Sequence, residues 1–122
     1  MHKVSIFFVL LLTYLTYSGW IYTGGTNTVA NMSPIELEGK HIFEKNNCQS
    51  CHQLFGLGGY LGPDLTTAVS NKNKGTAYAR AILQSGGSRM PVFHFSEKEI
   101  NALISYFTYV DRNANKQVKF AM

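Results

Sequence analysis

Two cysteines and a histidine form the chemically most distinctive motif of the chain. Cys48, Cys51 and His52 stand in the run CQSCH, which is a C-x-x-C-H spacing. This spacing is typical of covalent haem attachment, because two thiols add to the two vinyl groups of haem while the adjacent histidine reaches the iron. The motif therefore predicts one covalently bound haem c with His52 as an iron ligand.

Two other uses of closely spaced cysteines match the sequence less well. A zinc knuckle needs four ligands, usually with a second C-x-x-C, and His2, His41 and His94 do not have zinc-finger spacing. A thioredoxin-like dithiol expects a strand before the motif in an alternating α/β chain, and no strand pattern is visible anywhere in this sequence. Haem attachment is therefore the interpretation that the motif favours.

The iron needs a second axial ligand, and Met90 is the best match for it. Met90 precedes Pro91 in an expected loop that follows two glycines. A methionine ligand raises the reduction potential and suits electron transfer. His41 and His94 are competing ligands that would lower the potential, and burial of Met90 as an ordinary core residue is a further alternative.

The sequence also contains a partner for the other ring nitrogen of His52. The run Gly62-Pro63-Asp64-Leu65 follows the haem motif. An axial histidine needs its second nitrogen held, and a proline carbonyl can accept that hydrogen bond. We therefore expect the Pro63 carbonyl to orient His52.

Two expected helices have clear start signals. Ser33, followed by proline and by glutamate three residues on, predicts a helix from Pro34 to about Lys45. A second capping box at Ser96 predicts a helix to about Tyr109. A short helix is expected from Thr76 to Gln84, ended by two glycines.

The periodicity of the two long helices predicts how they meet. Gly39 and Phe43 lie four residues apart, so a small residue beside an aromatic one would let another helix approach closely. The last helix has an apolar stripe flanked by Tyr106 and formed by Ile100, Leu103, Ile104 and Phe107. We expect the tail from Asn113 onward to be frayed or to lie on a partner.

An apolar segment near the N-terminus predicts a membrane anchor. Val4–Tyr22 is an uncharged run that would span about 28 Å as a helix, close to the thickness of a bilayer core. Lys3 precedes it and no charge follows until Glu36, which places the N-terminus in the cytoplasm and the remainder outside. A cleaved signal peptide is the alternative. The expected organisation is an anchor (1–22), a flexible linker (23–32), a haem domain (33–111) and a tail (112–122).

Composition and charge exclude several classes of function. The chain has 122 residues, 45% of them hydrophobic, and a formal charge of +4, which is typical of one small folded domain and not of a disordered chain. The cations between Asp64 and Glu97 are spread out and are a candidate docking face for an acidic donor: Lys72, Lys74, Arg80 and Arg89. No nucleic-acid recognition element, nucleophile with its base or carboxylate pair is present, so we expect no nucleic-acid partner and no catalytic residues.

Taken together, these motifs resemble those of an all-α, small class I c-type cytochrome domain with one N-terminal transmembrane helix. More narrowly, the runs FEKNNCQSCHQLFGLGGYLGPDL and RMPVFHFSEKEINALISYF resemble the small, membrane-anchored cytochrome c subunit of bacterial nitric oxide reductase, which is called its C subunit. The narrower match is the more specific one, because the loop from Phe55 to Pro63 is not required for holding haem.

The resemblance implies a set of roles for this chain. Haem c would be held by Cys48, Cys51, His52 and Met90. It would relay single electrons from a soluble periplasmic donor, a cytochrome c or a cupredoxin, to haem b of a large multi-span catalytic subunit. That partner, which holds haem and non-haem iron, reduces NO to N2O. The chain would lie in the bacterial inner membrane with its haem domain in the periplasm.

The same family has a calcium ion near the boundary between the two subunits, and its loop carbonyls would correspond to those of Gly58 and Tyr60. Any residue can supply a backbone oxygen ligand, so the identities of the side chains at these two positions do not test whether this chain binds calcium.

Two other functions remain open at this point. The chain is a standalone membrane-tethered cytochrome c, or the equivalent subunit of another respiratory or nitrous oxide reducing system, if its electron acceptor differs. It is a haem-based gas sensor if the sixth ligand leaves the iron when a gas binds.

Overall fold

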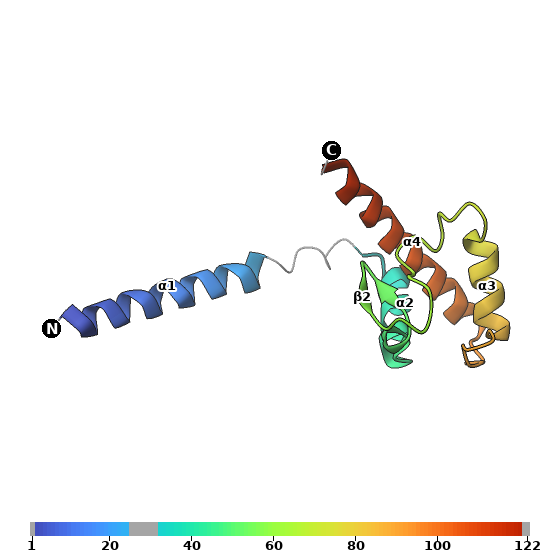
Figure 1. Cartoon of the computed structure of the whole chain (residues 1–122), viewed down its shortest axis with the longest axis horizontal. Coiled ribbons are helices and arrows are strands. Elements are labelled where there is room, and N and C mark those ends of the chain that lie inside the picture. The colour runs from blue at the N-terminus through green and yellow to red at the C-terminus, as the bar shows by residue number, and fades with distance from the viewer. Residues whose placement is uncertain (1, 25–31, 121–122) are drawn as a thin grey trace. The chain divides into compact units, whose positions relative to one another are not determined.

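The computed structural model describes residues 2–24 and 32–120, which fall into two compact units. Among these described residues, the first unit (residues 1–32) contains helix α1 (His2–Gly24), and the second (residues 33–122) contains the other elements (Figure 1). Residues 25–31, which make up most of the expected linker (23–32), lie outside the described residues.

Helix α1 includes the whole of the expected membrane segment. Its stretch Lys3–Thr23 is long and apolar enough to cross a bilayer, with a mean hydropathy of 1.7. The hydroxyls of Thr13 and Thr16 donate to the carbonyls of Val9 and Leu12 at 2.8 and 2.9 Å. These hydroxyls are therefore satisfied within the helix, as an apolar environment requires.

Helix α2 (Pro34–Lys45) begins with the capping box that the sequence predicts. The Ser33 N–H donates to the Glu36 carboxylate at 2.7 Å, and the Glu36 N–H donates to the Ser33 hydroxyl at 3.4 Å. The helix ends at Asn46, whose side-chain amide donates to the Ile42 carbonyl at 2.8 Å. Because the haem motif follows at once, the end of α2 fixes where that motif starts.

Helix α4 (Glu97–Phe120) also begins as predicted but is much longer than expected. The prediction that it ends near Tyr109 is wrong, because the helix continues to Phe120. That the segment from Asn113 onward lies on a partner stays a prediction. No glycine or proline follows Tyr109 to stop the helix. The first turn of α4 beyond Tyr109 also contacts the loop before helix α3 (Gly75–Ser85), because the Asp111 carboxylate accepts a hydrogen bond from the Ser70 N–H at 2.7 Å.

The core of the second unit lies where α2 crosses α4. A Cβ added to Gly39 would collide with the backbone carbonyl of Ala102, so the small residue permits the close approach expected from the sequence. One turn later the Phe43 ring packs against Tyr106 and Phe107, with ring centroids 5.6 and 6.0 Å apart. The predicted stripe is slightly rotated: Ile104 is only half-buried, whereas Ala102 and Tyr106 are buried.

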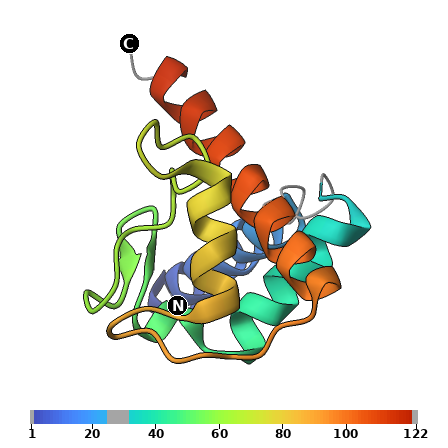
Figure 2. The same ribbon diagram turned by 90° about the vertical axis from the view of Figure 1, so that its right-hand side faces the viewer.

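Long loops connect these helices, which do not form an antiparallel bundle (Figure 2). They contain the 3-10 turn η2 (Cys48–Ser50), the antiparallel strands β1 (Gln53–Leu54) and β2 (Leu57–Gly58), and α3 (Gly75–Ser85). The expectation of no strand is therefore wrong, since strands of two residues are too short to show an alternating pattern. The expected mostly helical fold is confirmed.

An ion pair between the buried Glu36 of α2 and the half-exposed Arg112 of α4 also joins the two helices. Arg112 donates to the Glu36 carboxylate at 3.1 Å, and Glu36 is only 9% exposed. Burial acts to raise the pKa of Glu36, but the two hydrogen bonds from Ser33 and the Arg112 guanidinium together hold it below its ordinary value. The ionised carboxylate is therefore the stabilising form.

Substitution of Gly39 should separate the two helices. We expect Gly39→Ala to lower the free energy of unfolding by about 2 kcal/mol, because overpacking at the crossing outweighs the better helix propensity of alanine. Thermal unfolding of the protein, followed by the loss of helical structure in the second unit, measures this. The matched control is His41→Ala on the outer side of α2, where the His41 side chain is 69% exposed, and we expect a change within about 0.5 kcal/mol. Equal losses in the two variants would contradict the crossing.

The Glu36 pair should make stability depend on pH. Because the folded-state pKa is lowered, its contribution is present above the ordinary value of 4.5 and is lost as pH falls through the folded-state value. We expect Glu36→Gln to cost about 1–3 kcal/mol at pH 7, and to cost progressively less in acid as the wild type loses the same charge. Denaturant unfolding of the wild type and of Glu36→Gln at several pH values measures the cost at pH 7 and its decrease in acid. A cost that does not change with pH would refute the role of the ionised carboxylate.

Candidate haem site

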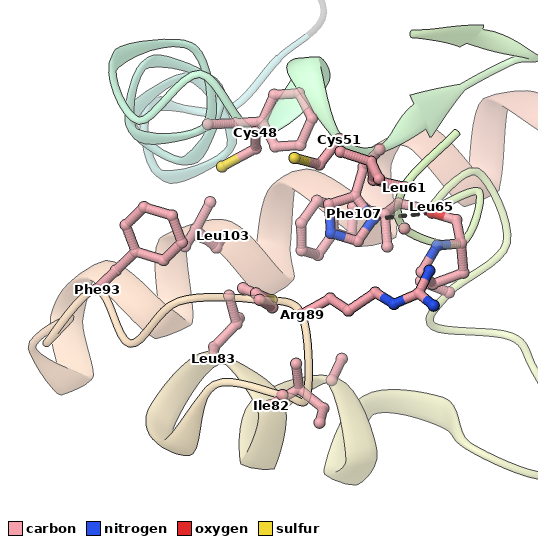
Figure 3. Close-up of a pocket in the computed structure, with 18 of the residues that line it drawn as sticks. Cys48, Cys51, Leu61, Leu65, Ile82, Leu83, Arg89, Phe93, Leu103 and Phe107 are labelled. Carbon is pink, nitrogen blue, oxygen red and sulfur yellow. Dashed lines mark hydrogen bonds between the residues drawn. The ribbon is translucent and has the colours of Figure 1, made fainter. Parts of the chain in front are cut away.

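The second unit encloses a cavity of about 570 Å³ between its helices and loops (Figure 3). This volume is within the range of ligand and cofactor pockets. Apolar side chains from the loop after β2, from α3 and from α4 form most of its wall: Leu61, Leu65, Ile82, Leu83, Leu103 and Phe107. Such a wall suits a large, flat, apolar group.

The cavity brings together residues that are far apart in the sequence. Cys48, Cys51, His52, Pro63 and Met90 all line it. The lining includes neither of the competing histidines. His41 lies on the exposed side of α2, and His94 is exposed and has a left-handed backbone with φ of 55°. The geometry therefore favours Met90 over either histidine as the second ligand.

The two cysteines are positioned by the tight turn η2. Asn47 adopts a left-handed conformation with φ of 51°, which reverses the chain directly after α2. The N–H groups of Cys51 and His52 both donate to the Cys48 carbonyl, at 3.2 and 3.0 Å. The turn thus places three chemically active side chains along one edge of the cavity.

Both cysteines are half-buried beside the cavity. Burial raises the pKa of the Cys48 thiol, and the neighbouring Cys51 adds to this effect. A redox-active dithiol needs the opposite, a lowered pKa that supplies the thiolate.

His52 is held by the atom that the sequence indicates. Its Nδ1 lies 2.8 Å from the Pro63 carbonyl oxygen, the contact drawn as a dashed line in Figure 3. A proline carbonyl can only accept, so Nδ1 carries the proton and Nε2 is the nitrogen left for a metal. A Cβ on Gly62 would overlap the His52 ring, so the glycine lets the loop lie directly against the imidazole.

The glycine-rich loop packs on the backbone of the haem motif. A Cβ on Gly58 would collide with the His52 carbonyl, and one on Gly59 with the Ser50 carbonyl. The N–H groups of Gly59 and Gly62 donate to the carbonyls of Gln49 and Cys51 at 2.9 and 2.8 Å. Sequence reasoning recognised the loop and named Gly58 only as a carbonyl ligand of calcium. It did not predict these close backbone contacts, for which the run GLGGYLGP was the available signal.

Asp64 fastens this loop to the hairpin. Its two carboxylate oxygens accept from the N–H of Thr66 at 2.7 Å and of Gly56 at 3.3 Å. Burial acts to raise the pKa of Asp64, but the hydrogen bonds from Thr66 and Gly56 hold it below the ordinary value. Sequence reasoning gave Asp64 no role of its own.

Met90 is fixed by the loop that follows α3. The Gly87 N–H donates to the Met90 carbonyl at 3.0 Å, and Gly86, with φ of 72°, ends α3 by donating to the Ile82 carbonyl at 2.8 Å. A Cβ on Gly86 would come within 2.9 Å of the Met90 carbonyl oxygen. The two glycines that ended the predicted helix therefore also position Met90.

The basic residues of this region have different surroundings. Arg80 donates to Glu97 at 2.9 Å and also to Asn101. Lys74 and Arg89 line the cavity instead, and the Lys74 ammonium lies 5.0 Å from the centre of the Tyr78 ring. The predicted basic face is thus divided between an ion pair and the cavity wall.

The residues present fit a covalent haem better than a zinc ion. Across the described part of the chain, no group of three or more His, Cys, Asp and Glu side chains is arranged to hold a metal. Two thiols, one oriented imidazole and one thioether around an apolar cavity are the donor set that haem c requires.

Known proteins agree with this interpretation. The family model described as "Cytochrome C oxidase, cbb3-type, subunit III" matches residues 36–107. The C subunit of nitric oxide reductase from Halomonas halodenitrificans is 30% identical over 120 residues, covering 88% of this chain and 80% of the relative. Its counterpart from Paracoccus denitrificans is 31% identical over 119 residues, covering 86% and 79%.

Each of these two matches extends beyond the C-x-x-C-H motif and includes most of this chain and most of the relative. A further relative with the same name, from Stutzerimonas stutzeri, is 26% identical over 118 residues, or 88% of this chain and 80% of the relative. The resemblance found in the sequence is thereby confirmed. The chain belongs to the family formed by the C subunits of nitric oxide reductases, and its second unit is a c-type cytochrome domain of the cbb3 subunit III class.

Proposed function

We propose that this chain is the haem c electron-transfer subunit of a nitric oxide reductase complex. The observation that carries the proposal is the cavity in which Cys48, Cys51, His52 and Met90 converge. The thiols of Cys48 and Cys51 would each form a thioether bond to the porphyrin. His52 and Met90 would be the axial ligands of the iron.

The chain's own residues prepare this site for electron transfer. Pro63 fixes the tautomer and orientation of His52, and its hydrogen bond makes the imidazole more electron-donating. Met90 would fill the second axial position and favour a high reduction potential. Haem c supplies a one-electron couple, and the apolar wall keeps water away from it. No described residue is assigned a catalytic role.

The partners follow from the names of the relatives, which are subunits of nitric oxide reductase. We propose a large multi-span catalytic subunit as electron acceptor and a soluble periplasmic cytochrome c or cupredoxin as donor. The family and the apolar helix α1 support a membrane anchor. The placement of Lys3 before this helix supports an orientation with the N-terminus in the cytoplasm and the haem domain in the periplasm.

A calcium ion at the boundary with the catalytic subunit is the remaining part of the proposal. Its ligands from this chain would be the carbonyls of Gly58 and Tyr60, which lie in the loop beside the haem motif, and Tyr60 is 86% exposed. The described residues contain no acidic cluster that could hold the ion, so most of its ligands would come from the partner. A chelator should therefore act on the assembled complex and leave the isolated domain unchanged.

Two substitutions test the haem ligands. We expect Met90→Ala to keep haem covalently attached, to lower the reduction potential and to let the ferrous iron bind CO readily. We expect Cys51→Ala to lose one thioether bond and most of the stable holoprotein. Haem staining, redox titration and CO difference spectra measure these effects.

Two histidine variants provide matched controls. His41→Ala and His94→Ala remove the competing ligands and should leave the potential and the CO spectrum unchanged. If His94→Ala binds CO readily while Met90→Ala keeps the wild-type CO spectrum, then His94, and not Met90, is the second axial ligand. Ready CO or NO binding by the wild type would instead support a gas sensor.

Purification of the native complex tests the assignment to a reductase. A tag after Met122, extraction in mild detergent and haem typing should yield this chain together with haem b and NO consumption. Recovery of this chain alone, carrying haem c and inactive toward NO, would make it a standalone membrane-tethered cytochrome c.

A further inference from the structure

The cavity wall includes two cations, Lys74 and Arg89. Figure 3 shows the Arg89 side chain extended along the cavity, toward the side on which Leu65 lies. The other arginines of the folded domain have carboxylate partners: Arg80 pairs with Glu97 at 2.9 Å and Arg112 with Glu36 at 3.1 Å. Among the described ion pairs, none includes Arg89.

The cavity wall does not supply an anion for Arg89. Asp64 is the acidic residue among the lining side chains. Both of its carboxylate oxygens already accept backbone N–H groups, from Thr66 and Gly56, and hold the hairpin. The second cation is in a different situation, since the Lys74 ammonium lies over the Tyr78 ring. Within the described residues, Arg89 is therefore the cation of the cavity that lacks a counter-ion from the chain.

The group that we propose for this cavity carries such anions. Haem has two propionate carboxylates, which must be hydrated or paired when the rest of the porphyrin is placed in an apolar wall. A guanidinium is planar, is always charged and offers parallel N–H donors that match a carboxylate. Arg89 lines the cavity and is itself exposed, so it provides the complement for a propionate at the solvent-facing side of the site.

We propose that Arg89 binds a haem propionate and is a determinant of the reduction potential of the site. This inference rests on the proposed haem function and adds a residue to it. Arg89 directly precedes Met90, so one loop places both the iron's thioether ligand and the propionate's cation. A fixed positive charge beside the porphyrin favours the reduced iron, which carries one positive charge fewer.

The test uses the full chain with haem attached and compares Arg89→Gln with Arg89→Lys. In Arg89→Gln we expect the oxidised-to-reduced ratio at a fixed ambient potential to rise about tenfold, which lowers the midpoint by about 59 mV for a one-electron couple. The propionate carboxylate band in redox-difference infrared spectra should shift as well. Arg89→Lys should restore most of the potential, because it restores the charge.

The matched control is Arg80→Gln, which removes an arginine whose partner is Glu97 and which is not part of the cavity wall. It should leave the propionate band unchanged. Covalent haem is quantified in every sample, so that a wild-type chain without haem would refute the proposed function, not this inference. Holoprotein of Arg89→Gln with unaltered potential and propionate band overturns the inference. The same result together with a weakened salt dependence of electron transfer from the donor would assign Arg89 to donor docking instead.

Discussion

The close crossing of α2 and α4 at Gly39 is the contact on which the site depends. It brings two helix backbones together, and the Phe43 ring then fills the angle between them. Because α2 ends at Asn46, this crossing sets the position at which η2 and its two cysteines begin. The same helix α4 supplies Leu103 and Phe107 to the wall of the cavity. One packing contact thus positions both the edge of the cavity that carries the two cysteines and the wall that α4 contributes.

The loops around the cavity are held by a different kind of force. Glycines at 58, 59 and 62 allow backbone to lie on backbone and on the His52 ring, where any side chain would collide. Hydrogen bonds from Gly59 and Gly62 to carbonyls of the haem motif close the contact. The arrangement depends on main-chain atoms, so a loop with little regular structure can still orient the His52 imidazole.

The parts of this structure that follow local rules were predictable from the sequence. Capping boxes at Ser33 and Ser96 gave the starts of α2 and α4, and the spacing of the haem motif indicated its chemistry. The long end of α4 was missed, although no glycine or proline follows Tyr109 to stop the helix. The contacts of Asp111 and Arg112 with residues distant in sequence, which hold its first added turn, could not be predicted. The placement of Arg89 in the cavity was missed for the same reason, since adjacency to Met90 does not state where a side chain points.

The cavity also has a consequence for how the protein matures. A space of about 570 Å³ lies directly beside the apolar core that α2 and α4 form, and Leu103 and Phe107 belong to both. Before a cofactor fills it, the walls contributed by α3 and by the loop around Met90 have few partners to pack against. If haem fills the cavity as proposed, haem attachment and final folding are linked steps, and weakly destabilising changes anywhere in these walls would be seen first as chain without haem.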